Sequence, residues 1–151
     1  AADAMVVVSY NEYNHLLQAG FKMPEVGVFR FSEHGYNIQE NGVYVKRDYY
    51  DTHRKQVEAF AKASRRGWEW TAEHPDEALD IVMKYVQQDH VPTNRVMQKL
   101  MLKEILRLQK DSDSGKREFR VRPDMVKKAS RLMQEGGMLK HEVTYDQLMG
   151  K

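Results

Sequence analysis

The sequence predicts an α/β fold in which short early strands precede a mostly helical carboxy-terminal half. The first observation is a valine-rich apolar run at residues 4–10, which is typical of a buried strand. The second is a change at Asp51 to apolar residues with a helical period, which favours a long amphipathic helix. The length of 151 residues, with 41% hydrophobic and 30% charged residues, is enough for one folded core.

The early half is predicted to hold one short helix and further extended stretches. Residues 11–19 place apolar side chains at helical spacing ahead of Gly20, a residue type that often ends helices. Extended stretches are expected at residues 25–31 and 42–45, because valine and phenylalanine dominate there. The polar segment between them, residues 32–41, is predicted to be a loop.

The later half is predicted to consist of helices joined by sharp corners. The long helix from Asp51 should end at His74, because Pro75 disfavours helical backbone before it and suits the first turn of the next helix. A third helix is expected from Thr93, acting as N-cap, to about residue 110, with Val96 buried. A fourth should begin at Pro123 and end at two glycines, and a tail helix is expected at residues 145–149.

Composition and motifs argue against several classes of function. The absence of cysteine excludes disulfides, thiolate metal sites and cysteine nucleophiles, and the six histidines are too far apart for a histidine metal motif. No nucleotide-binding glycine loop or serine-nucleophile signature occurs, so we expect no cofactor, no metal, no catalytic residue and no enzymatic activity. The net charge of +2 does not favour a nucleic-acid partner, and the early apolar run is too short to span a membrane.

Polar and aromatic residues gather in two of the predicted loops. Tyrosine rings can stack on a flat ligand, asparagine amides can donate and accept, and Glu12 can accept a hydrogen bond from a ring N–H or an amine. A small-molecule site is therefore predicted, although a helix cap at Asn11 and an ordinary turn would explain the same residues. The predicted ligand-binding residues are Tyr10, Asn11, Glu12 and Tyr13 after the first strand, and His34, Tyr36 and Asn37 in the next loop.

Three segments carry a resemblance to a known family: DAMVVVSYNEYNHLLQAG, HGYNIQENGVYVKRDY and GWEWTAEHPDEALDIVMK. They resemble the carboxy-terminal half of type II periplasmic solute-binding proteins of ABC transporters, in the branch of thiamine-pyrimidine-precursor, nitrate, sulfonate and taurine binders. The resemblance implies a partial type II periplasmic-binding-protein-like fold. Residues 1–32 would end a distal lobe, residues 33–42 would form a hinge crossing, and residues 43–151 would complete the proximal lobe.

The same resemblance implies a function. The chain would be a solute-binding component, or a fragment of one, that holds a small heteroaromatic or amine-bearing ligand in a cleft. Residues 10–13 would face the ligand, and His34, Tyr36 and Asn37 would lie at the hinge. A transporter permease would be the partner of the full-length protein, in the periplasm or another extracytoplasmic space, although the sequence shows no signal peptide. Because the resemblance covers one half of such a protein, we expect a homodimer or pairing with the missing half.

Two other functions remain open from the sequence. The chain could be a truncated or mobile-element-derived structural or interaction module without a ligand. It could also be part of a thiamine-pyrimidine synthase, in which case the lysine and histidine that the resemblance implies for that reaction would come from another chain.

Overall fold

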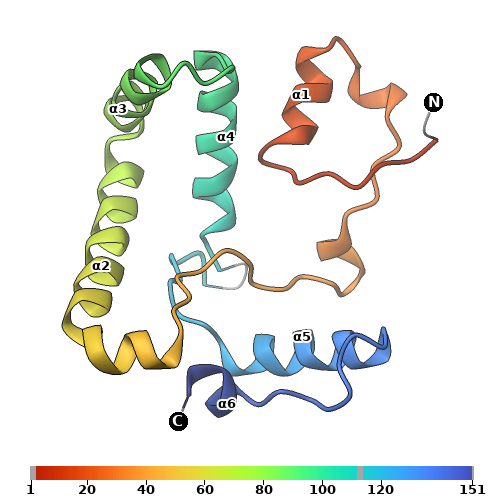
Figure 1. Ribbon diagram of the computed structural model, residues 1–151. Coiled ribbons are helices and arrows are strands. Elements are labelled where there is room, and N and C mark those ends of the chain that lie inside the picture. The colour runs from red at the N-terminus through yellow and green to blue at the C-terminus, as the bar shows by residue number, and fades with distance from the viewer. Residues whose placement is uncertain (1–2, 112–113, 151) are drawn as a thin grey trace. The chain divides into compact units, whose positions relative to one another are not determined.

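A computed structural model describes residues 3–111 and 114–150 (Figure 1). The chain divides into two compact units, which we describe separately. Unit 1 comprises Ala1–Val28 and Ser64–Glu118, and unit 2 comprises Phe29–Ala63 and Phe119–Lys151. The lobe and hinge boundaries that the resemblance implies, at residues 32 and 42, stay a prediction.

The predicted α/β fold class, and with it the partial type II fold with early strands, is wrong for the described residues. They form α-helices and two short 3-10 helices, η1 (Met23–Glu25) and η2 (Phe31–His34). β-pairing within the described part of the chain is confined to one isolated antiparallel bridge between Lys110 and Arg117.

Local hydrogen bonding explains why the first predicted strand does not form. The Val8 carbonyl accepts from the backbone N–H groups of Asn11 and Tyr13, both at 3.3 Å. The Val8 N–H in turn donates to the Glu12 carboxylate at 3.0 Å. In a strand these backbone groups would form hydrogen bonds with a neighbouring strand, so the turn competes directly with the pairing of strands in a sheet. The extended stretches predicted at 25–31 and 42–45 likewise find no strand partner among the described residues, and η1 and η2 enter the first of them.

Unit 1 is built around α3 (Pro75–Gln88) and α4 (Arg95–Leu108), which pack against each other. Its other elements are α1 (Glu12–Gln18), η1 and the end of α2 (Arg47–Glu73). Leu79 from α3 and Met97 from α4 are each 1% exposed and are the largest fully buried side chains of the described residues. Helix α1 also packs on α4, so α4 carries contacts on two sides.

The helix boundaries in unit 1 follow the predicted signals with one shift. The corner at residues 74–75 is confirmed, since Pro75 occupies the first turn of α3. The N-cap of α4, however, is Asn94 rather than Thr93, and its side chain accepts from the Met97 N–H at 2.9 Å. The predicted burial of Val96 is also wrong. Val96 is 64% exposed, and Met97 takes the core position.

Unit 2 contains η2, the first part of α2, α5 (Pro123–Glu135) and α6 (Tyr145–Met149). Helix α2 begins four residues earlier than predicted, and it bends at His53, whose φ of −125° and ψ of 27° are not helical. Helices α5 and α6 are confirmed and pack on each other. Buried Ser130 on α5 accepts from the Val143 N–H and so fixes the loop that leads to α6. A reciprocal capping box between Thr144 and Gln147 starts α6.

Candidate functional site

The predicted ligand residues of the early loop lie together in unit 1, in what we call the tyrosine turn (residues 9–14). Tyr10, Asn11 and Tyr13 are half-buried, and Glu12 is exposed at the first position of α1. Asn11 has the N-cap position, but its side chain makes no capping hydrogen bond. The cap explanation considered for Asn11 therefore does not account for its amide group.

Glu12 is held by the backbone of its own turn. Its Oε2 accepts from the Val8 N–H at 3.0 Å. The hydrogen bonds from its own backbone N–H and from the Val8 N–H, with a smaller effect of the nearby His15, lower the pKa of the Glu12 carboxyl below its ordinary value. The side chain is thus a positioned carboxylate that is ionised at neutral pH and open to solvent on one side.

Asn14 is the residue of the tyrosine turn that sequence reasoning missed. It is 7% exposed, and its Nδ2 donates to the Tyr10 carbonyl at 3.0 Å. The bond ties the first turn of α1 back to Tyr10, two residues before the helix, and so closes the backbone between Tyr10 and Asn14 into a turn. Such a buried side-chain amide is a positioning group, because it fixes the loop without reaching solvent.

The second group of predicted residues lies in unit 2, in what we call the aromatic segment (residues 29–37). The His34 ring stacks on Phe29 with centroids 4.0 Å apart and an interplanar angle of 9°. Tyr36 meets Phe31 edge to face at 6.3 Å, and Phe31 meets Phe29 in the same way at 5.8 Å. Gly35 allows this arrangement, because its φ of 86° turns the chain back after η2.

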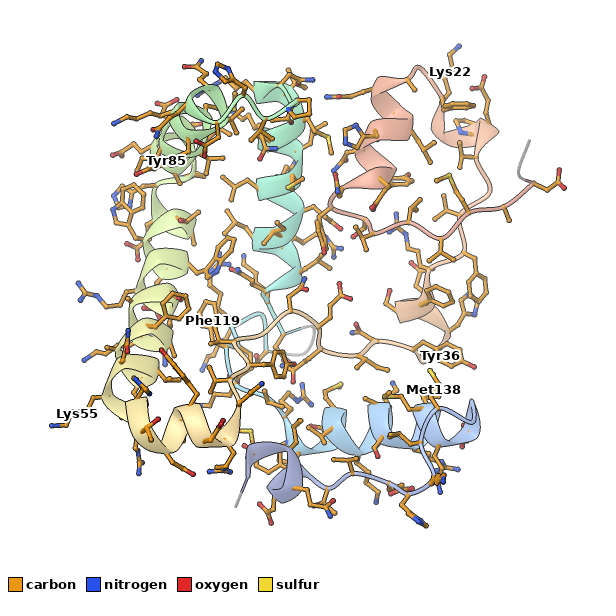
Figure 2. All side chains as sticks on the ribbon, viewed as in Figure 1. Lys22, Tyr36, Lys55, Tyr85, Phe119 and Met138 are labelled. Atoms are coloured by element: carbon orange, nitrogen blue, oxygen red, sulfur yellow. The ribbon has the colours of Figure 1, made fainter. Side chains whose placement is uncertain are left out.

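The rings of the aromatic segment remain largely open to solvent. Phe29, Phe31 and Tyr36 are 62%, 54% and 51% exposed, and Tyr36 is labelled in Figure 2. Asn37 is also exposed. Phe29 and Phe31 were not predicted as site residues. The alternation FRF was a usable signal, since residues two apart in an extended segment point to the same side.

The structure therefore brings the predicted site residues together in two groups rather than one. Tyr10–Tyr13 belong to unit 1, and His34, Tyr36 and Asn37 belong to unit 2. Each group is a local cluster with its own internal contacts. That the two groups face one ligand stays a prediction.

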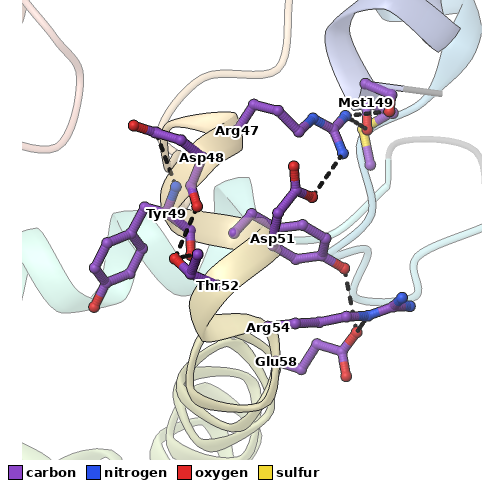
Figure 3. A network of polar contacts seen from close by, with 10 residues as sticks. Arg47, Asp48, Tyr49, Asp51, Thr52, Arg54, Glu58 and Met149 are labelled. Carbon is purple, nitrogen blue, oxygen red and sulfur yellow. Dashed lines mark hydrogen bonds and ion pairs between the residues drawn. The ribbon is translucent and has the colours of Figure 1, made fainter.

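A polar network at the start of α2 is a further group of charged residues, and it is explained by packing within unit 2 (Figure 3). Arg47 donates to the carbonyls of Met149 and Gly150 at the end of α6, and it lies 3.8 Å from Asp51. Arg54 pairs with Glu58 at 2.8 Å one turn further along α2. Because the guanidinium of Arg47 satisfies carbonyls that α6 leaves open, the network joins these two helices.

Metal binding and membrane crossing gain no support from the described residues. Within residues 3–111 and 114–150, no three potential metal-ligating side chains come together. None of the helices in this part of the chain combines the length and apolar character needed to cross a bilayer.

Comparison with known proteins identifies the family of the chain. A family model described as NMT1/THI5 like matches residues 1–78, which is just over half of the 151 residues. The chain belongs to the NMT1/THI5-like family. The matched residues include both the tyrosine turn and the aromatic segment, and they end within the first turn of α3. No curated protein and no solved structure matches the chain significantly.

Membership in the NMT1/THI5-like family confirms the resemblance to the type II periplasmic-binding branch at the level of the family. This family is one of solute-binding and thiamine-synthase-related proteins, and it points to a small molecule as the partner. The assignment to the carboxy-terminal half of such a protein, the link to an ABC transporter and the pairing with a second chain stay predictions.

Proposed function

We propose that the chain is a solute-binding component, or a fragment of one, of an ABC-type importer, and that it acts outside the cytoplasm by binding rather than by catalysis. Its ligand is a small heteroaromatic compound that carries an amine. The observation that carries this proposal is the tyrosine turn. There an ionised, exposed carboxylate stands between two half-buried tyrosines, within the segment that belongs to the NMT1/THI5-like family.

The chemistry of the tyrosine turn suits an amine on a flat ring. Glu12 offers carboxylate lone pairs to N–H donors, and its ionised state makes such a hydrogen bond charge-assisted. The rings of Tyr10 and Tyr13 supply flat apolar surface, and the Asn11 amide can both donate and accept. Asn14 holds this backbone in place, so less conformational entropy is lost when the ligand binds.

The aromatic segment supports the same class of ligand from within unit 2. Its exposed rings are faces on which a heteroaromatic ligand can stack, and His34 adds a ring nitrogen that can donate or accept. Exposed rings of this kind also fit the alternative of an interaction module, because aromatic side chains are enriched at protein interfaces. The experiment on Glu12 separates the two.

Titration of 4-aminopyrimidine into the isotopically labelled protein, followed by NMR chemical shifts, tests the proposal. Pyrimidine, which lacks the amino group, serves as the comparison ligand. We expect saturable binding of 4-aminopyrimidine with shifts at residues 9–14, and weaker binding of pyrimidine. Glu12→Gln should lower the affinity for 4-aminopyrimidine about tenfold, since a charge-assisted hydrogen bond becomes a neutral one.

Glu25→Gln is the matched control. The Glu25 carboxylate also accepts from a backbone N–H, that of Lys22 at 2.9 Å, and it is also exposed in unit 1. Both variants therefore lose one charge and perturb one local backbone contact. Equal affinities of the two variants, or an absence of saturable binding by the unaltered protein, would contradict the proposal and leave the interaction module as the better reading.

A further inference from the structure

A second concave site lies in unit 1, outside the tyrosine turn. It is a groove of about 400 Å³ between the start of α3 and one side of α4, and it continues to Arg117 beyond that helix. Its floor is apolar and contains Leu102 and Leu106, with Pro75 at one end. A volume in the range of about 300–1,000 Å³ is typical of small-molecule sites. We call this site the basic groove.

The basic groove takes its charge from the helical repeat of α4. Lys99, Lys103 and Arg107 follow one another at intervals of four residues, so they fall on one side of the helix. Lys110 and Arg117 extend the same row beyond the end of α4. Within residues 3–111 and 114–150, Asp76 is the one acidic residue that lines the groove.

Part of this charge is neutralised within the protein. Lys99 pairs with Asp76 at 3.0 Å, and Arg107 makes two hydrogen bonds to Glu104, at 2.8 and 2.7 Å. By contrast, Lys103 and Lys110 form no ion pair with any described residue. The groove therefore keeps uncompensated positive charge over an apolar floor.

Arg117 adds a guanidinium whose position is fixed and which pairs with no carboxylate among the residues that the structure describes. It donates through NH1 to the Leu106 carbonyl at 3.0 Å and to the Gln109 side chain at 2.9 Å, and both acceptors are neutral. The bridge between Lys110 and Arg117 also holds the backbone of these two residues together. A positioned arginine beside two open lysines is the arrangement that recognises a phosphate group.

We propose that the basic groove binds a small phosphate ester. The phosphate contacts Lys103, Lys110 and Arg117, and the apolar body of the ester covers Leu102 and Leu106. All five of these residues lie beyond the residues 1–78 that match the family model, whereas Pro75 and Asp76 at one end of the groove lie within them. The site is independent of the tyrosine turn and of the function proposed for it.

Isothermal titration of phenyl phosphate into the unaltered protein tests this inference, with inorganic phosphate and benzyl alcohol as the two partial ligands. We expect phenyl phosphate to bind more tightly than either, because only it has both the anion and the apolar body. Lys103→Gln and Lys110→Gln should each weaken binding about five- to tenfold. Raising the salt concentration should weaken it further, since the contacts are ionic.

Lys84→Gln is the matched control, because Lys84 is an exposed lysine of unit 1 that does not line the groove. Lys84→Gln should leave the affinity for phenyl phosphate unchanged. Glu12→Gln should also leave it unchanged, because Glu12 belongs to the tyrosine turn and not to the groove. The inference is overturned if phenyl phosphate shows no saturable binding at millimolar concentrations, or if Lys103→Gln and Lys110→Gln bind it as well as Lys84→Gln does. Equal affinity for inorganic phosphate would overturn the part assigned to the apolar floor.

Discussion

Replacing Leu79 with alanine should destabilise unit 1 by about 3 kcal/mol. The substitution removes three carbon atoms from a side chain that is 1% exposed. At about 0.8 kcal/mol for each buried carbon, the transfer term is about 2.4 kcal/mol, and an incompletely closed cavity adds to it. Since small domains are stable by only about 5–15 kcal/mol, this loss is a large share of the total.

Urea unfolding followed by far-ultraviolet circular dichroism measures the effect. With a slope of about 2 kcal/mol per molar urea, the midpoint of the transition should fall by about 1.5 M. Ile81→Ala is the control on the same helix, because Ile81 is 51% exposed and alanine favours helix. It should change stability by less than about 0.5 kcal/mol. If Leu79→Ala unfolds at the same urea concentration as Ile81→Ala, the packing of α3 on α4 does not hold unit 1 together, and the reasoning fails.

Two further predictions concern local hydrogen bonds in unit 1. Asn94→Ala should lower the free energy of unfolding by about 1 kcal/mol in the same urea experiment, because it removes the cap on the Met97 N–H. Thr93→Ala should lower it clearly less. The reverse order would mean that Thr93 is the N-cap. Glu12 should titrate in carboxyl-detected NMR below its ordinary value of 4.5, because the folded protein holds the ionised form. The contribution of Glu12 to the stability of the folded protein is therefore complete above pH 4.5 and is lost as the pH falls through the lower pKa of the folded state. If the chemical shift of the Val8 N–H does not follow this titration, the hydrogen bond from Val8 to Glu12 is contradicted.

The helices of the later half could be predicted because their ends carry strong local signals. Pro75 and Pro123 begin α3 and α5, and Gly137 follows α5 with a left-handed φ of 72°. Asn94 was missed because it stands beside Thr93 and both residue types cap helices. Val96 was assigned to the core from apolar spacing, which does not distinguish it from its neighbour Met97, and Met97 takes the buried position.

The strands could not be predicted correctly from the sequence, because a strand depends on partners that a local pattern does not reveal. The valine-rich run has the composition of a buried strand, but its end at Val8 is used by the turn that Glu12 closes. A strand propensity of this kind is overridden when the backbone groups find nearer partners. The local grouping of the site residues was easier to predict, since it depends on neighbours in the sequence, but their role in binding a ligand stays a prediction. Tyr10 and Glu12 do lie in one turn, whereas Phe29 was overlooked because it was assigned to an extended stretch and was not considered as a ring for ligand contact.

The two roles of Glu12, in the turn and in the proposed ligand site, are compatible for a physical reason. A carboxylate has about four lone-pair positions, and the backbone N–H groups of Val8 and of Glu12 itself occupy two of them. Backbone donors stabilise the negative charge without cancelling it as a lysine or arginine would, so a ligand amine still meets a full charge in a fixed position. Glu25 has the same kind of backbone contact but no tyrosine on either side. The difference between these two glutamates therefore isolates what the tyrosine turn adds to a carboxylate, namely apolar ring surface on which the remainder of a ligand can rest.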